Sequence, residues 1–158
     1  MISKAQPPFV RSLHLITKDY FGVLAEKLNH LDIERYFYPL IVIAKEDIGI
    51  TQKKLSDLLE LDKVTTSRIV DYLACKGYLG REQNPDDRRV IRLKPTEKAI
   101  SDAQEIEGAM MEIELELFAA VSDKERTCFE KVVRTLGDTI HEMPKESVKF
   151  DYKKLKNK

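Results

Sequence analysis

The sequence predicts a mainly α-helical protein with one short β-hairpin near its middle. Three observations indicate this fold class. Apolar residues recur at spacings of three and four along most of the 158 residues, as on the buried face of an amphipathic helix. Residues that favour helix ends, such as Thr51, Asp62 and Gly77, separate these segments. Residues 78–94 alone depart from the helical period, because turn-forming residues stand there between two short apolar stretches.

The first two expected helices span residues 9–31 and 33–46. The first starts after Pro7-Pro8, and its predicted inward face consists of Leu13, Ile16, Tyr20, Val23, the stem of Lys27, and Leu31. The second has one apolar face, formed by Ile33, Phe37, Leu40, Ile41 and Ala44. Pro39 lies inside it and lacks a backbone donor, so we expect a kink or a division there.

Two shorter helices follow. Thr51 is the predicted N-cap of a helix over 52–59, which turns inward the side chains of Leu55, Leu58 and Leu59. Asp62 is the predicted N-cap of a second helix over 63–76, and Gly77 is its C-cap residue. The apolar stripe of this second helix consists of Ile69, Val70 and Leu73.

A hairpin is expected next, with strands at residues 78–82 and 90–93. The sequence Asn84-Pro85-Asp86-Asp87 between them is a turn-forming cluster. Arg88 and Arg89 follow this cluster directly, so the tip of the hairpin is basic.

Two long helices, over 97–121 and about 123–142, complete the predicted fold. The first turns inward Ile100, Ala103, Ile106, Met110, Ile113, Leu117 and Val121. The second opens with a capping box formed by Ser122 and Glu125. It is predicted to bury Phe129, Val132, Val133, Leu136 and Ile140. Pro144 ends it, and we expect the Lys-rich tail that follows to be mobile.

The 27 basic and 27 acidic side chains cancel, but they are unevenly distributed. Residues 50–98 carry eleven positive and eight negative charges, whereas residues 99–147 carry five and twelve. A basic segment of this kind permits binding of a polyanion. The sequence shows no apolar run of the roughly 20 residues that a membrane helix needs, and no signal peptide. Its two cysteines form no CxxC pattern, so a cytoplasmic protein is expected.

The order of short helix, tight turn, second helix and hairpin is that of a winged helix-turn-helix, which places its second helix in the major groove of DNA. Short hydroxyls, a methyl-bearing side chain and an arginine at the start of this helix suit contacts with base edges. The start of the preceding helix can hold a phosphate, and adjacent wing arginines suit the minor groove. The predicted DNA-binding residues are Thr51, Gln52, Lys53, Lys63, Val64, Thr65, Ser67, Arg68, Asp87, Arg88 and Arg89.

This central stretch resembles the MarR family of transcriptional regulators, and the flanking helices extend the resemblance to about residues 9–143. It is carried by Thr51, Leu55, Ser67, Arg68, Leu73, Gly77, Tyr78, Leu79, Arg81, Asp87, Arg89 and Thr96. Thr66 departs from the aliphatic residue usual in the family, but its hydroxyl can bond the carbonyl four residues back. Pro95 replaces the usual leucine and leaves the end of the second strand open.

The resemblance implies a homodimer. Residues 9–46 and 97–143 would form the helical dimerisation region, residues 47–96 the DNA-binding region, and residues 144–158 a basic tail. It also implies a regulator that binds a roughly palindromic operator in double-stranded DNA, as a repressor released by a small-molecule effector. Small anionic aromatic compounds are the expected effectors, with Tyr36, Tyr38 and His14 as candidate neighbours of their crevice.

The same residues allow other interpretations. A winged helix can instead bind a protein partner without binding DNA. Arg68 can pair with Asp71 or Glu60 instead of contacting DNA. Asp87 is favoured as the structural partner of an arginine over a catalytic carboxylate.

Few residues other than the predicted DNA-binding residues could carry chemistry. Cys75 and Cys128 are predicted to be small buried side chains, with redox sensing as the alternative. The three histidines share no metal-ligand spacing, and the chain lacks the common catalytic motifs. We therefore expect no metal, no cofactor and no enzymatic activity.

Overall fold

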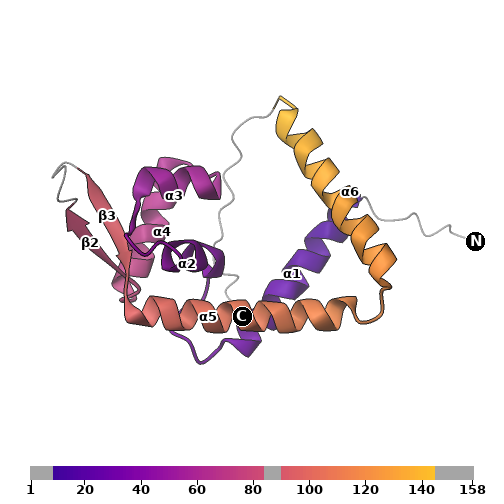
Figure 1. Ribbon diagram of the computed structural model, residues 1–158, viewed down its shortest axis with the longest axis horizontal. Coiled ribbons are helices and arrows are strands. Elements are labelled where there is room, and N and C mark those ends of the chain that lie inside the picture. Colours follow the sequence, from indigo (N-terminus) through magenta and orange to yellow (C-terminus); the bar gives the residue numbers. More distant parts are fainter. Residues whose placement is uncertain (1–8, 84–89, 145–158) are drawn as a thin grey trace, which may run out of the picture. The chain divides into compact units, whose positions relative to one another are not determined.

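The computed structural model describes residues 9–83 and 90–144 of the chain (Figure 1). Six helices and three strands follow one another within these ranges. The helices are α1 (Phe9–Lys27), α2 (Phe37–Ala44), α3 (Gln52–Leu59), α4 (Lys63–Cys75), α5 (Glu97–Phe118) and α6 (Asp123–Glu142). The strands are β1 (Ile50–Thr51), β2 (Leu79–Gln83) and β3 (Ile91–Pro95). The predicted mainly α-helical fold with six helices is confirmed.

The sheet has three strands and not two, because β1 pairs with the predicted hairpin. The strand order is β1-β3-β2, and both pairings are antiparallel. Ile50 of β1 lies opposite Leu93 of β3. Gly49 precedes β1 at a φ of +77°, and a Cβ there would lie 3.0 Å from the carbonyl oxygen of Leu93, so glycine suits this close approach. A strand of two residues is too short to show the alternating period by which strands are predicted.

Helix ends follow the capping residues predicted from the sequence. Ser122 and Glu125 form the complete capping box at the start of α6. At the end of α4, Gly77 adopts a left-handed conformation with φ at +76°. This conformation lets the N–H of Tyr78 donate to the carbonyl oxygen of Leu73 at 2.9 Å, which satisfies a carbonyl of the last helical turn.

The two N-terminal helices are shorter than predicted. Residues 28–36 form a non-helical connection between them, although the apolar spacing continues through Leu28 and Ile33, which are both buried. The apolar period therefore indicated burial there but not helix. Pro39 neither kinks nor divides α2, because it lies in the first turn, where its missing N–H would have no partner within the helix.

The chain divides into two compact units, residues 1–117 and residues 118–158. The first unit has one hydrophobic core to which α1 to α5 and all three strands contribute. Thr66 is fully buried in it, and its hydroxyl donates to the carbonyl oxygen of Asp62 at 2.9 Å, as predicted. No helix in the described ranges is long and apolar enough to cross a membrane.

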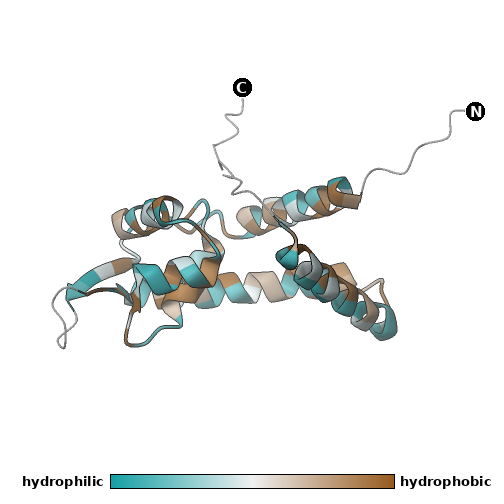
Figure 2. Cartoon of the chain, turned by 90° about the horizontal axis from the view of Figure 1, so that it is seen from above, coloured by the Kyte–Doolittle hydropathy of each residue, from teal (hydrophilic) through white to brown (hydrophobic). Residues whose placement is uncertain are grey.

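Several faces predicted to be buried are exposed in the single chain. On α1, Leu13, Ile16 and Val23 are exposed, while Leu24 enters the core. On α6, which belongs to the second unit, no residue is buried. Its predicted inward side chains are 44–65% exposed, namely Phe129, Val132, Val133, Leu136 and Ile140. Figure 2 shows hydrophobic and hydrophilic residues side by side on these helices. Leu58, Ile100, Leu117 and Val121 are exposed as well. The helical period identifies an apolar face but not the molecule that covers it.

Candidate nucleic-acid interface

α3 and α4 form the helix-turn-helix expected from the sequence. Residues 60–62 connect them, and the first of these adopts a left-handed conformation. The Ser56 hydroxyl closes the turn by donating to the carbonyl oxygen of Leu61 at 2.5 Å. Leu55 of α3 and Ile69 of α4 are buried in the same core, so apolar packing holds the two helices together.

Five of the predicted DNA-binding residues lie in the N-terminal half of α4. Lys63, Val64 and Arg68 are exposed, and Thr65 and Ser67 are half-buried. Val64 is 61% exposed although the core of the unit begins on the opposite face of its own helix. The structure therefore places short hydroxyls, a methyl-bearing side chain and an arginine near one end of α4. That these residues bind DNA stays a prediction.

The start of α4 is capped by a negative charge. Asp62 Oδ1 accepts hydrogen bonds from the backbone N–H groups of Val64 and Thr65 at 2.8 and 2.9 Å. Asp62 Oδ2 accepts from the Thr65 hydroxyl at 2.8 Å. These contacts confirm the predicted N-cap and hold the Thr65 side chain in one orientation. The carboxylate also occupies the place at which a helix N-terminus would bind an anion.

The start of α3, by contrast, is capped by a neutral group. The Thr51 hydroxyl accepts from the backbone N–H of Lys54 at 3.1 Å, as predicted. Lys53 is exposed and pairs with Asp57 one turn further on, at 2.7 Å between Nζ and Oδ2. Gln52 is half-buried in the first turn. An uncharged cap beside a lysine suits the phosphate contact that was predicted for this end of α3.

The predicted wing residues Asp87, Arg88 and Arg89 lie outside the described residues. The described part of the wing carries a contact that sequence reasoning missed. Arg81 of β2 donates from Nη2 to Oδ1 of Asp71 on α4 at 2.5 Å, so Asp71 pairs with Arg81 and not with Arg68.

A sequence signal for this contact did exist. Arg81 lies two residues after the buried Leu79 and opposite the buried Leu93. The period of two therefore places Arg81 on the face of the sheet that is turned toward the core and α4.

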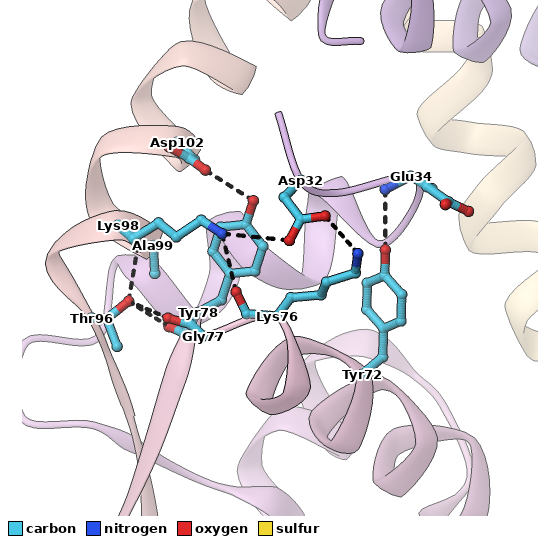
Figure 3. A network of polar contacts seen from close by, with 10 residues as sticks. All are labelled: Asp32, Glu34, Tyr72, Lys76, Gly77, Tyr78, Thr96, Lys98, Ala99 and Asp102. Atoms are coloured by element: carbon cyan, nitrogen blue, oxygen red, sulfur yellow. Dashed lines mark hydrogen bonds and ion pairs between the residues drawn. The ribbon is translucent and has the colours of Figure 1, made fainter. Parts of the chain in front are cut away.

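A polar network surrounds the C-terminal end of α4 (Figure 3). Tyr78 is fully buried, and its hydroxyl donates to Oδ2 of Asp102 on α5 at 2.9 Å. Burial, and then the hydrogen bond to this carboxylate, raises the pKa of the Tyr78 hydroxyl well above its usual range. Thr96 Oγ1 donates to the carbonyl oxygen of Gly77 at 2.9 Å and accepts from the N–H of Ala99 at 3.2 Å. One side chain thus joins the end of α4 to the start of α5.

The predictions for the two cysteines also differ from the structure. Cys75 and Cys128 are both exposed in the single chain, and not buried as predicted. Cys75 lies two residues after the buried Leu73, which turns it about 200° away from the core face of α4. The position of Cys75 on the helix, and not the apolar character of cysteine, therefore determines its exposure.

The effector crevice, with Tyr36, Tyr38 and His14 as its candidate neighbours, stays a prediction. His14 and Tyr38 are exposed, and Tyr36 packs edge-on against Tyr72 with the ring centroids 5.2 Å apart. An open hollow of about 400 Å³ lies elsewhere, lined by Lys27, Leu28, Glu105, Gly108, Ala109 and Glu112.

Comparison with protein families and curated proteins finds relatives for the central part of the chain. Residues 38–91 match the model described as the MarR family. The multiple antibiotic resistance protein MarR of Escherichia coli (strain K12) is 30% identical over 89 residues, which cover 56% of this chain and 62% of that protein. The transcriptional repressor MprA of the same organism is 28% identical over 116 residues, which cover 73% and 66%. The chain thus spans less than two thirds of the length of these two relatives.

Solved structures match over more of the chain. A crystal structure of MarR is 28% identical, with a TM-score of 0.68 over 86% of this chain and 99% of that one. A MepR–DNA complex from S. aureus is 18% identical, with a TM-score of 0.77 over 85% of this chain and 99% of that one. The second likeness shows a shared fold.

Proposed function

We propose that this chain is a member of the MarR family and acts as a homodimeric transcriptional regulator that binds a specific sequence in double-stranded DNA. The observation that carries the proposal is the composition of the exposed end of α4. Thr65, Ser67 and Arg68 offer one methyl group, two hydroxyls and a planar donor to the groove, and these groups match the edges of base pairs. One structural neighbour, MepR of S. aureus, was solved as a complex with DNA.

Phosphate contacts would fix the register of α4 in the groove. The N-terminus of α3, with its uncharged Thr51 cap and Lys53 beside it, is proposed to supply one such contact. Arg88 and Arg89 of the wing are proposed to supply the others, to phosphates and to the minor groove.

A second copy of the chain is proposed to cover the exposed apolar faces of α1 and α6. A stable monomer rarely exposes contiguous apolar faces of this extent. A homodimer presents two copies of α4 related by a two-fold axis, so the operator is proposed to be roughly palindromic.

We further propose that the chain represses genes near its operator and that a small anionic aromatic effector releases it. One relative carries the name of a transcriptional repressor, MprA. Release requires the effector to bind the DNA-free form more tightly than the DNA-bound form. DNA must then lower the affinity for the effector by the same factor by which the effector lowers the affinity for DNA. Titration of salicylate with and without operator measures this factor, and equal affinities in the two titrations would exclude salicylate as the effector.

The test of DNA binding is a selection of fragments from the source genome by the purified protein, followed by sequencing. We expect one enriched sequence with two related half-sites. Its affinity should exceed that of a scrambled duplex by about a thousandfold or more, and both affinities should fall as salt rises. Retention of no duplex at low salt would overturn the proposal and favour a winged helix that binds a protein partner.

A further inference from the structure

Residues 32–36 contact the C-terminal end of α4 and the residue that follows it through ring contacts with Tyr72 and through two hydrogen bonds, which Figure 3 shows. Asp32 Oδ1 accepts a hydrogen bond from Nζ of Lys76 at 2.6 Å, and Lys76 directly follows the last residue of α4. The backbone N–H of Glu34 donates to the Tyr72 hydroxyl at 3.1 Å. Residues 32–36 therefore bind α4 at its C-terminal end, which is the end opposite to Thr65.

Asp32 also reaches the start of α5. Its Oδ2 lies 3.9 Å from Lys98 Nζ. Lys98 in turn donates to the carbonyl oxygen of Lys76 at 3.0 Å and lies 4.2 Å from the centre of the Tyr78 ring. The hydrogen bond from Lys76, followed by the charges of both lysines, lowers the pKa of Asp32. One charged carboxylate thus holds together the α1–α2 connection, the end of α4 and the start of α5.

We propose that Asp32 is a positioning residue for DNA recognition: it fixes the angle at which α4 presents Thr65 and Ser67 to the bases. This inference rests on the proposed function. The 13 residues of α4 span about 20 Å. A tilt of about 3° at the Asp32 end moves the opposite end by about 1 Å, a distance over which a hydrogen bond to a base is lost. Discrimination between sequences therefore depends on a contact far from the DNA.

Because this cluster is exposed, its effect on the orientation of α4 can be measured apart from its effect on stability. The Asp32 side chain is 60% exposed, and exposed ion pairs contribute little to the free energy of unfolding. Removal of the Asp32 charge should therefore leave the fold intact while α4 gains orientational freedom. Phosphate contacts tolerate such freedom better than base contacts do, because a charge interaction depends weakly on angle.

The experiment compares Asp32→Asn with the wild type and with Glu112→Gln. Glu112 is a matched control, because it is an exposed carboxylate of α5 whose ion pair, at 3.1 Å, is with Lys27 of α1. The probes are the duplex recovered by the wild type in the genomic selection and a scrambled duplex of the same composition. Asp32→Asn should weaken binding to the recovered duplex by about threefold to tenfold and leave the scrambled duplex unaffected. Its unfolding midpoint should stay within about 2 °C of the wild type.

Asp32→Glu keeps the negative charge and should recover most of the discrimination that Asp32→Asn loses. A merely structural role for the α1–α2 connection would not require this recovery. Unchanged discrimination in Asp32→Asn would overturn the proposal. A wild type that retains no duplex at all would instead refute the proposed function. In that case hydrogen exchange of residues 63–78, which needs no DNA, still tests whether Asp32 holds α4 in place: faster exchange in Asp32→Asn than in Glu112→Gln supports this part of the inference, and equal exchange refutes it.

Discussion

Arg81 of β2 and Asp71 of α4 form an ion pair that joins the first strand of the wing to the proposed recognition helix, with 2.5 Å between Nη2 and Oδ1. Their side chains are 50% and 62% exposed, so the pair contributes at most about 1 kcal/mol to the free energy of unfolding. Its larger effect is geometric. We infer that it holds the wing at a defined angle to α4, as the proposed binding of wing and helix to one duplex would require.

Replacing Asp71 with Asn should therefore affect DNA binding more than stability. The change breaks the ion pair but removes no positive charge. We expect a loss of less than about 1 kcal/mol in urea unfolding and a clear loss of affinity for operator DNA. A double-mutant cycle with Arg81→Gln measures the coupling in binding. Strictly additive effects on binding would show that the pair does not position the wing.

Thr65→Ala should reduce discrimination and spare nonspecific binding. A good base contact is worth about 1–3 kcal/mol, and its loss should relax the preference at one position of each half-site. Thr65→Ser is the matched control, because it keeps the hydroxyl that Asp62 holds at 2.8 Å. Binding to operator and scrambled duplex checks both variants. Equal losses for the two duplexes would assign Thr65 a structural role only.

Arg88→Ala should weaken binding to operator and scrambled duplex alike, because a phosphate contact carries no sequence information. The slope of log affinity against log salt should become shallower by about one per lost contact, or about two in a symmetric dimer. Lys124→Ala removes the same charge from the exposed start of α6 and should leave the slope unchanged. An unchanged slope in a folded Arg88→Ala dimer would exclude the wing from the interface.

The chain should sediment at low micromolar concentration with about twice its mass of 18.3 kDa. The interface should bury more than about 2,000 Å², as obligate dimers do. Leu136→Asp places a charge in the apolar face of α6 and should shift the equilibrium to unfolded or aggregated chains. Thr135→Asp, its exposed neighbour, should stay dimeric. A folded monomer of the wild type at this concentration would contradict the proposed dimer.

Stability should decline in alkali through Tyr78. Burial, and then the bond to Asp102, raises the pKa of its hydroxyl in the folded protein. The unfolded chain releases this proton above about pH 10 while the folded chain retains it, so the contribution is complete below that pH and is lost above it. Urea unfolding across this range should show a shallower decline for Tyr78→Phe than for wild type. Tyr38→Phe is the exposed control. Identical declines for wild type and Tyr78→Phe would rule out this cause.

Local chemistry made part of this molecule predictable from its sequence. The caps at Thr51, Asp62 and Ser122 depend on hydrogen bonds that span two or three residues, and all three were located correctly. The bond from Thr66 to the carbonyl four residues back is equally local. For the same reason, five candidate DNA-binding residues could be placed together near one end of α4.

What the sequence could not supply depends on contacts between distant segments. The pairing of β1 with β3 becomes visible only once the chain has folded. The same holds for Asp32, whose partners Lys76 and Lys98 lie more than forty residues away. The apolar face of α6 is another feature that the sequence leaves open. An apolar period shows that a face needs to be covered, but not which chain covers it.

The charge at Asp62 bears on how the proposed regulator would search a genome. Every duplex offers phosphates, and a helix start with free N–H groups would rest on any of them. At α4 the carboxylate holds the N–H groups of Val64 and Thr65, and its negative charge would repel the phosphates of a duplex bound there as proposed. If these helix starts face DNA as proposed, each stop at a wrong sequence is shortened, while the start of α3 keeps the protein on the DNA as it moves. In the proposed complex, speed of search and selectivity at the target would thus be divided between two helix starts, one capped by Thr51 and the other by Asp62.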